Sequence, residues 1–124
     1  MAKTFLVVDD EVRIGEILED LIHDTFGEDS KVLKALNGKD ALAQFGAEKH
    51  VDLIFLDIIM PEINGIKFIE TLRTEMGSNT PVLVVSASVE EAQEKTSKYT
   101  NVSYISKPIM KEEFDQKVME IFKA

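Results

Sequence analysis

The chain has no cysteine and no long apolar run, and these two absences exclude several classes of protein. Without cysteine there is no disulfide framework, no thiolate metal site and no cysteine nucleophile. The apolar run at residues 5–8 stops at Asp9 and Asp10. A membrane span needs about 20 apolar residues, and a signal peptide needs a longer apolar stretch with a cleavage site. The sequence therefore predicts a cytoplasmic protein without a membrane contact.

Basic residues are scarce as well, since 14 Lys and Arg stand against 23 Asp and Glu and leave a net charge of −9. Binding to nucleic acid depends largely on clustered Lys and Arg, so direct nucleic-acid binding is not expected. The excess of acidic residues favours solubility. A more specific interpretation is that it also attracts the basic surface of a partner. From the length of 124 residues we expect a single domain over residues 1–124.

Short apolar runs alternate with helical patterns along the whole chain. Runs rich in Val, Ile, Leu and Phe are typical of strands buried on both faces of a parallel sheet. They lie at residues 5–8, 32–36, 51–56, 82–85 and 102–105. Helices are predicted near residues 11–25, from Asn37 onward, and near 64–77, 89–98 and 111–122. This alternation predicts right-handed crossovers and a three-layer α/β sandwich.

Three of these helices differ in how much apolar surface they offer. The first is expected to bury one stripe of side chains, namely Ile14, Ile17, Leu18, Leu21 and Ile22. The third is expected to bury Ile66, Ile69, Leu72 and Met76 and to end at Gly77. The fourth, at 89–98, has few apolar residues and is expected to be short or mobile.

Polar side chains stand where the apolar runs stop. The first run is followed by Asp9 and Asp10, the third by Asp57, the fourth by Ser86, and the fifth is followed closely by Lys107. In open parallel sheets the ligand site lies outside the carboxyl ends of the strands. We therefore expect carboxylates, a hydroxyl and an ammonium to meet at one edge of the sheet.

Clustered carboxylates repel one another unless a cation neutralises them, and oxygen ligands without His or Cys favour Mg²⁺. Lys107 and Ser86 would then bind a phosphoryl group, and one carboxylate would act as the nucleophile. Each residue alone also has a plainer interpretation. Asp10 and Glu11 fit the N-terminus of a helix, and Asp57 fits a turn. Ser86 fits a helix cap, and Lys107 fits a solvated surface residue. Their joint placement at strand ends favours the phosphoryl site.

Four segments, at residues 5–11, 53–65, 82–87 and 104–108, resemble the signatures of response-regulator receiver domains, in the family's order and spacing. The resemblance covers essentially the whole chain. It implies a flavodoxin-like (βα)5 sandwich with a five-stranded parallel sheet in the order 2-1-3-4-5. It also implies a cis peptide bond between Lys107 and Pro108.

The resemblance assigns a role to each site residue. It implies that Asp57 is the phosphoacceptor, that Asp10 binds Mg²⁺ directly and that Asp9 binds it through water. The backbone carbonyl of Ile59 would complete the metal ligands. Lys107 would contact Asp57 before phosphorylation and the phosphoryl oxygens afterwards.

The resemblance also implies how the signal leaves the site. Ser86 would bind the phosphoryl group and move inward, and the small Ala87 would leave access for the donor. Tyr104 matches the family's aromatic switch residue, which changes the face made by the fourth helix, fifth strand and fifth helix. The alternative for Tyr104 is an ordinary half-buried strand tyrosine.

The function expected from these residues is a phosphorylation-dependent switch, not an enzyme acting on other molecules. Its phosphoryl donor would be a sensor histidine kinase or a histidine phosphotransfer protein, and its target an unknown protein, with a phosphorylation-linked homodimer as a further possibility. A haloacid-dehalogenase-type phosphatase is disfavoured, because that family has its nucleophile in an Asp-x-Asp motif after the first strand. A pseudo-receiver that only binds partners is disfavoured because the acids and Lys107 are intact. Met1 and the lack of a trailing linker favour a stand-alone regulator over a fragment.

Overall fold

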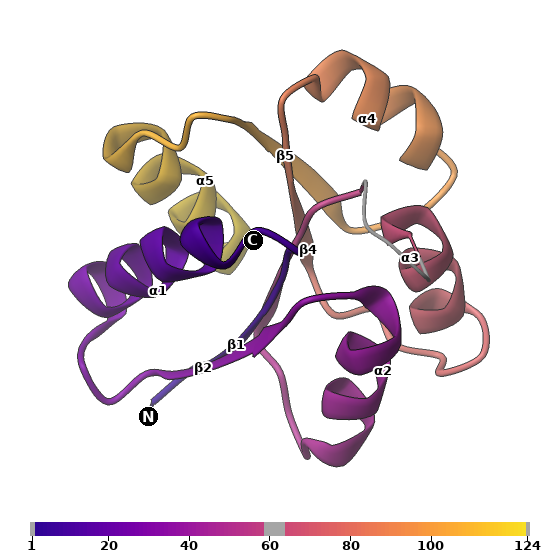
Figure 1. Cartoon of the computed structure of the whole chain (residues 1–124), viewed down its shortest axis with the longest axis horizontal. Coiled ribbons are helices and arrows are strands. Elements are labelled where there is room, and N and C mark those ends of the chain that lie inside the picture. The colour runs from indigo at the N-terminus through magenta and orange to yellow at the C-terminus, as the bar shows by residue number, and fades with distance from the viewer. Residues whose placement is uncertain (1, 59–63, 124) are drawn as a thin grey trace.

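The fold is a parallel sheet covered by helices on both faces (Figure 1). The computed structural model describes residues 2–58 and 64–123, so Ile59, expected to offer its carbonyl to a metal, lies outside the described residues. The described elements are β1 Thr4–Val8, α1 Val12–Phe26, β2 Lys31–Ala35, α2 Gly38–Ala47, β3 Leu53–Leu56, α3 Gly65–Arg73, β4 Val82–Ser86, α4 Val89–Thr96, β5 Val102–Ser106 and α5 Lys111–Lys123.

The five strands pair in the order β2-β1-β3-β4-β5, and every pair is parallel, which confirms the predicted fold. The central strands β1, β3 and β4 are almost entirely buried, because their uninterrupted apolar side chains face helices on both sides. The edge strands β2 and β5 are more exposed. Lys31 and Lys34 on β2 make ion pairs with Glu48 and Glu19, and such charges blunt an open edge.

Two separate cores lie on the two faces of the sheet. Helices α1 and α5 cover one face and α2, α3 and α4 cover the other, as Figure 1 shows. Two expected core residues are instead 39 % exposed, namely Ile17 and Met76. On α1 the buried stripe passes through Leu18, and Ile17 lies about 100° away around the helix. Helix α3 ends at Arg73, so Met76 lies outside the helix and is not part of its buried face. Phe68 is a buried residue of α3 that was not among the expected ones.

Helix α4 is the shortest of the described helices, in agreement with the expectation of a short helix. It ends at Thr96, two residues before its expected end, and buries only Ala92 and Thr96. The loop that follows is held by Arg73, whose guanidinium donates to the carbonyls of Ser78, Thr100 and Asn101.

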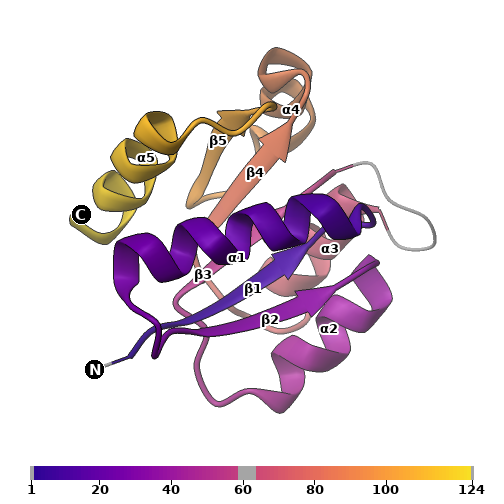
Figure 2. The same ribbon diagram turned by 60° about the vertical axis from the view of Figure 1, so that its left-hand side comes forward.

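Both ends of the described chain lie at the amino end of the sheet, away from the carboxyl edge (Figure 2). The Lys3 ammonium is 4.4 Å from the ring centroid of Phe122, and the rings of Phe5 and Phe122 are 6.2 Å apart. These contacts join the first strand to the last helix. In the described part of the chain, no helix has the length and apolar character needed to cross a membrane.

Candidate functional site

The carboxyl ends of β1 and β3 bring four acidic side chains together. One carboxylate oxygen from each of Asp9, Asp10, Glu11 and Asp57 lies within 4.8 Å of the others. The backbone sets this placement, because the sheet hydrogen bonds continue past the strand ends. The Asp9 N–H donates to Ala35 on β2, and the Asp57 N–H donates to Val8 on β1 at 2.9 Å. The predicted meeting of Asp9, Asp10 and Asp57 is therefore observed.

A close backbone approach fixes the chain just after Asp57. The Gly65 N–H donates to the Ile58 carbonyl at 2.8 Å. A Cβ atom at Gly65 would lie 2.5 Å from the Ile58 Cα and 2.6 Å from the Asp57 carbonyl oxygen, so only glycine fits. Asn64 begins α3 by accepting a hydrogen bond from the Lys67 N–H. The start of α3 therefore holds the backbone at Asp57 in place.

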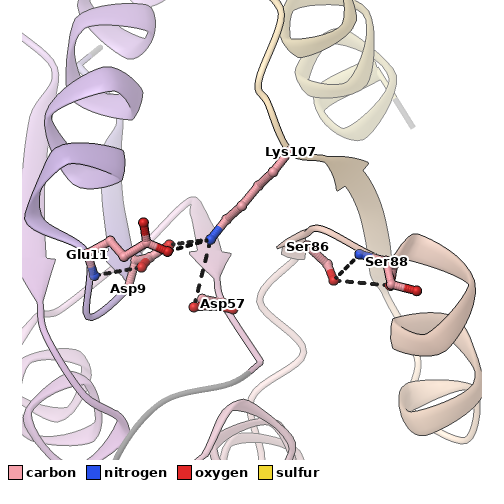
Figure 3. A network of polar contacts seen from close by, with 6 residues as sticks. All are labelled: Asp9, Glu11, Asp57, Ser86, Ser88 and Lys107. Atoms are coloured by element: carbon pink, nitrogen blue, oxygen red, sulfur yellow. Dashed lines mark hydrogen bonds and ion pairs between the residues drawn. The ribbon is translucent and has the colours of Figure 1, made fainter.

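The Lys107 ammonium lies among three of these carboxylates (Figure 3). It is 3.3 Å from a Glu11 oxygen, 3.5 Å from Asp9 and 3.9 Å from Asp57. The expected contact with Asp57 is present, but Glu11 is the nearest partner. Glu11 does occupy the N-cap position of α1, yet its side chain makes no capping hydrogen bond. The peptide bond between Lys107 and Pro108 is cis, as the resemblance implies.

Burial and charge shift the ionisation of two groups in the cluster. Burial raises the pKa of Asp9 to about 6; a hydrogen bond from the Glu11 N–H opposes this rise, and the charge of Asp57 adds to it. Burial alone would lower the pKa of Lys107, but the charges of Asp9 and Asp57 outweigh it and raise that pKa. The four carboxylates therefore carry more negative charge than the Lys107 ammonium neutralises.

The donor set fits a hard divalent cation. The buried Asp9 Oδ2 accepts no hydrogen bond from the described residues, although it faces Lys107 and the other carboxylates. A buried carboxylate oxygen that accepts no hydrogen bond is costly, and a divalent cation bound beside it reduces that cost. All four side chains offer oxygen, which is the ligand that Mg²⁺ prefers.

Ser86 lies in the same cleft of about 450 Å³ as Asp57, but its hydroxyl is directed toward α4. It donates to the Ser88 carbonyl at 3.1 Å and accepts from the Ser88 N–H at 3.0 Å, as Figure 3 shows. Ser88 is in turn the N-cap of α4 and accepts from the Glu91 N–H. The exposed Ala87 also lines this cleft.

Tyr104 is half-buried on β5, and its hydroxyl meets the hydroxyl of Thr96 at 2.5 Å. The sequence predicts no role for Thr96 and no contact between Ser86 and Ser88. Ser88 directly precedes a predicted helix, and that position is a recognisable cap signal. Thr96 gives no such signal, because its contact depends on how α4 packs on β5.

This fold, with acids at its carboxyl edge, is that of a receiver-type α/β domain. The response regulator receiver domain family matches residues 5–119, so the chain belongs to this family. It is 33 % identical over 109 residues to the transcriptional regulatory protein MalR of Bacillus subtilis, a match that covers 88 % of this chain and 46 % of MalR. It is 37 % identical to a protein-glutamate methylesterase/protein-glutamine glutaminase 2 of Methanosarcina acetivorans, covering 83 % of this chain and 29 % of the relative. The chain thus spans less than half the length of these relatives.

Solved structures agree with this fold. A response regulator 1452 receiver domain from Francisella has a TM-score of 0.77 and 28 % identity, and the match covers 98 % of this chain and 97 % of that one. A protein from Chloroflexus aurantiacus that is described as a response regulator has a TM-score of 0.86 with full coverage of both chains. Its identity of 24 % supports the fold alone.

Proposed function

We propose that this receiver domain is a switch in which Asp57 accepts a phosphoryl group from the phosphohistidine of a sensor kinase or phosphotransfer protein. A carboxylate oxygen of Asp57 forms the new P–O bond as the P–N bond of the donor breaks, and the leaving imidazole takes up a proton. The observation that carries the proposal is the position of Asp57, between the Lys107 ammonium at 3.9 Å and the other acids.

The acids are proposed to hold Mg²⁺ in distinct ways. Asp10 and Asp57 would bind it directly, Asp9 through water, and the Ile59 carbonyl would complete the set. Mg²⁺ would supply positive charge that offsets the charge developing on the phosphoryl oxygens. The unsatisfied Asp9 Oδ2 supports this assignment.

Lys107 and Ser86 are proposed to stabilise the phosphorylated state. The Lys107 ammonium would contact the phosphoryl oxygens, and the Ser86 hydroxyl would leave Ser88 to donate to them. Ala87, whose side chain is only a methyl group, would leave the opening clear for the donor. The inward movement of Ser86 and Tyr104 would then change the face formed by α4, β5 and α5, which a partner protein recognises.

We further propose that residues 1–124 form one receiver domain that acts in the cytoplasm and catalyses only the phosphorylation and dephosphorylation of its own Asp57. Its partners would be the phosphoryl donor and a downstream protein, without direct contact to nucleic acid or a membrane. The net charge of −9 supports the exclusion of nucleic acid.

Intact-protein mass spectrometry after incubation with acetyl phosphate tests the proposal. We expect one phosphoryl adduct that requires Mg²⁺ and is absent from Asp57→Ala. Asp20→Ala removes an exposed aspartate outside the cluster and should keep the adduct. A folded wild-type protein without an adduct would instead be a module that binds partners without phosphorylation.

A further inference from the structure

Tyr104 and Thr96 make a hydrogen bond whose direction is set by a second contact. The Thr96 hydroxyl donates to the carbonyl of Ala92, one turn earlier in α4, at 2.8 Å. A threonine hydroxyl has only one hydrogen, so in the contact with Tyr104 the tyrosine donates and Thr96 accepts. Thr96 is fully buried, so water does not replace this acceptor.

This bond links the last turn of α4 to strand β5. Only Ala92 and Thr96 are buried on α4, whose other side chains are mostly charged. The ring of Tyr104 packs against the core under α2, α3 and α4. The tyrosine is therefore joined to the last turn of α4 by packing and by its hydroxyl.

The other end of α4 is attached to the site by a second hydroxyl. Ser86, at the end of β4, exchanges two hydrogen bonds with Ser88, and Ser88 caps the helix. Ser88 and Thr96 are separated by about two helical turns. A phosphoryl group on Asp57 that draws the Ser86 hydroxyl away from Ser88 thus loosens the end of α4 opposite to Thr96.

We propose that Thr96 is a positioning residue that holds Tyr104 against α4 in the unphosphorylated protein. Tyr104 leaves Thr96 when the phosphoryl group draws Ser86 inward. The release rests on the proposed function of Asp57, whereas the resting contact does not depend on it.

A double-mutant cycle tests the resting contact. Thr96→Val removes the acceptor and keeps the shape, and Tyr104→Phe removes the donor. We expect the two substitutions to be coupled by a factor of about five in the unfolding equilibrium constant, measured by urea denaturation. Either substitution alone removes the same hydrogen bond, so the second substitution cannot remove it again. Thr100→Val is the control, since the Thr100 hydroxyl donates to Asn79 and its effect should add to that of Tyr104→Phe. Additive effects of Thr96→Val and Tyr104→Phe would overturn the contact.

Binding of beryllofluoride, a phosphoryl mimic, tests the release. A contact present only in the resting state opposes binding, so Thr96→Val should bind beryllofluoride with Mg²⁺ about fivefold more tightly, as followed by ¹⁹F NMR. In a protein that already carries Tyr104→Phe, Thr96→Val should leave the affinity for beryllofluoride unchanged. Unchanged affinity of Thr96→Val would show that Tyr104 stays on Thr96 and would overturn the release.

If the wild-type protein binds no beryllofluoride, the proposed role of Asp57 fails and the release fails with it. The unfolding cycle still decides the resting contact in that case.

Discussion

The polar side chains around α4 and the carboxyl edge of the sheet form two halves of opposite character. The acidic half, Asp9, Asp10, Glu11 and Asp57, lies after β1 and β3, and backbone hydrogen bonds hold the chain in place at Asp9 and Asp57. The hydroxyl half, Ser86, Ser88, Thr96 and Tyr104, lies between β4, α4 and β5 and is joined mainly by bonds between neutral groups. Fixed charge suits the binding of a cation and a phosphoryl group. Neutral hydroxyl bonds are weak enough to be exchanged for others.

Gly65→Ala should have the largest effect, because it disturbs the backbone under the acidic half. The added Cβ would lie 2.5 Å from the Ile58 Cα, and relieving that overlap should cost about 4 kcal/mol of unfolding free energy in urea denaturation. Gly46→Ala is the matched control, since its Cβ would meet only Met76 at 3.7 Å. That change should stabilise α2 by about 0.5–1 kcal/mol. Equal effects at the two glycines would contradict a fixed acidic half.

Asp9→Asn should stabilise the protein, since it removes a buried charge that lacks a hydrogen bond at one oxygen. Burial raises the pKa of Asp9 from 3.8 to about 6, so the folded state disfavours its ionised form. In EDTA at pH 7 we expect the variant to gain about 3 kcal/mol in unfolding free energy, at about 1.4 kcal/mol per pKa unit.

The sign of the pH dependence follows from the same shift. Between pH 6 and 4 the folded wild-type protein binds a proton at Asp9 that the unfolded chain does not, so this group adds stability as the pH falls. The advantage of Asp9→Asn should therefore shrink below about pH 6 and vanish near pH 4. Asp10→Asn, at an exposed position, should change stability by less than about 0.5 kcal/mol. A pH-independent gain for Asp9→Asn would contradict the burial argument.

Ser86→Ala should have the smallest effect on stability and a clear effect on the proposed switch. Its two hydrogen bonds lie within an exposed loop, so the loss should be below about 1 kcal/mol. Affinity for beryllofluoride should fall about tenfold, because the hydroxyl that would donate to the mimic is gone. Ser97→Ala, on another exposed hydroxyl of the same region, should alter neither quantity. Unchanged affinity in Ser86→Ala would remove Ser86 from the proposed switch.

The parallel sheet and the meeting of the acids were predictable because both follow from regular backbone geometry, whereas the strand order was implied by the family resemblance. Uninterrupted apolar runs determine which strands are central, and parallel strands bring their carboxyl ends to one edge. Asp9 and Asp57 each directly follow a strand, so their positions needed no knowledge of side-chain packing.

The contacts of individual side chains were less predictable. Glu11 had the pattern of a helix cap, but its carboxylate contacts Lys107, which follows β5 far along the chain. Ile17 fits an apolar spacing yet faces outward, since the sheet admits only a narrow stripe of α1. Thr96 meets Tyr104 through packing between α4 and β5, which no local pattern encodes.

The contact between Lys3 and Phe122 has a practical meaning for protein engineering. Because the first strand and the last helix touch at the amino end of the sheet, a short linker is enough to join the two ends of the chain. A circularly permuted form, opened in a loop elsewhere, would then keep every strand pair. A fluorescent reporter fused at the present ends would likewise stand clear of Asp57.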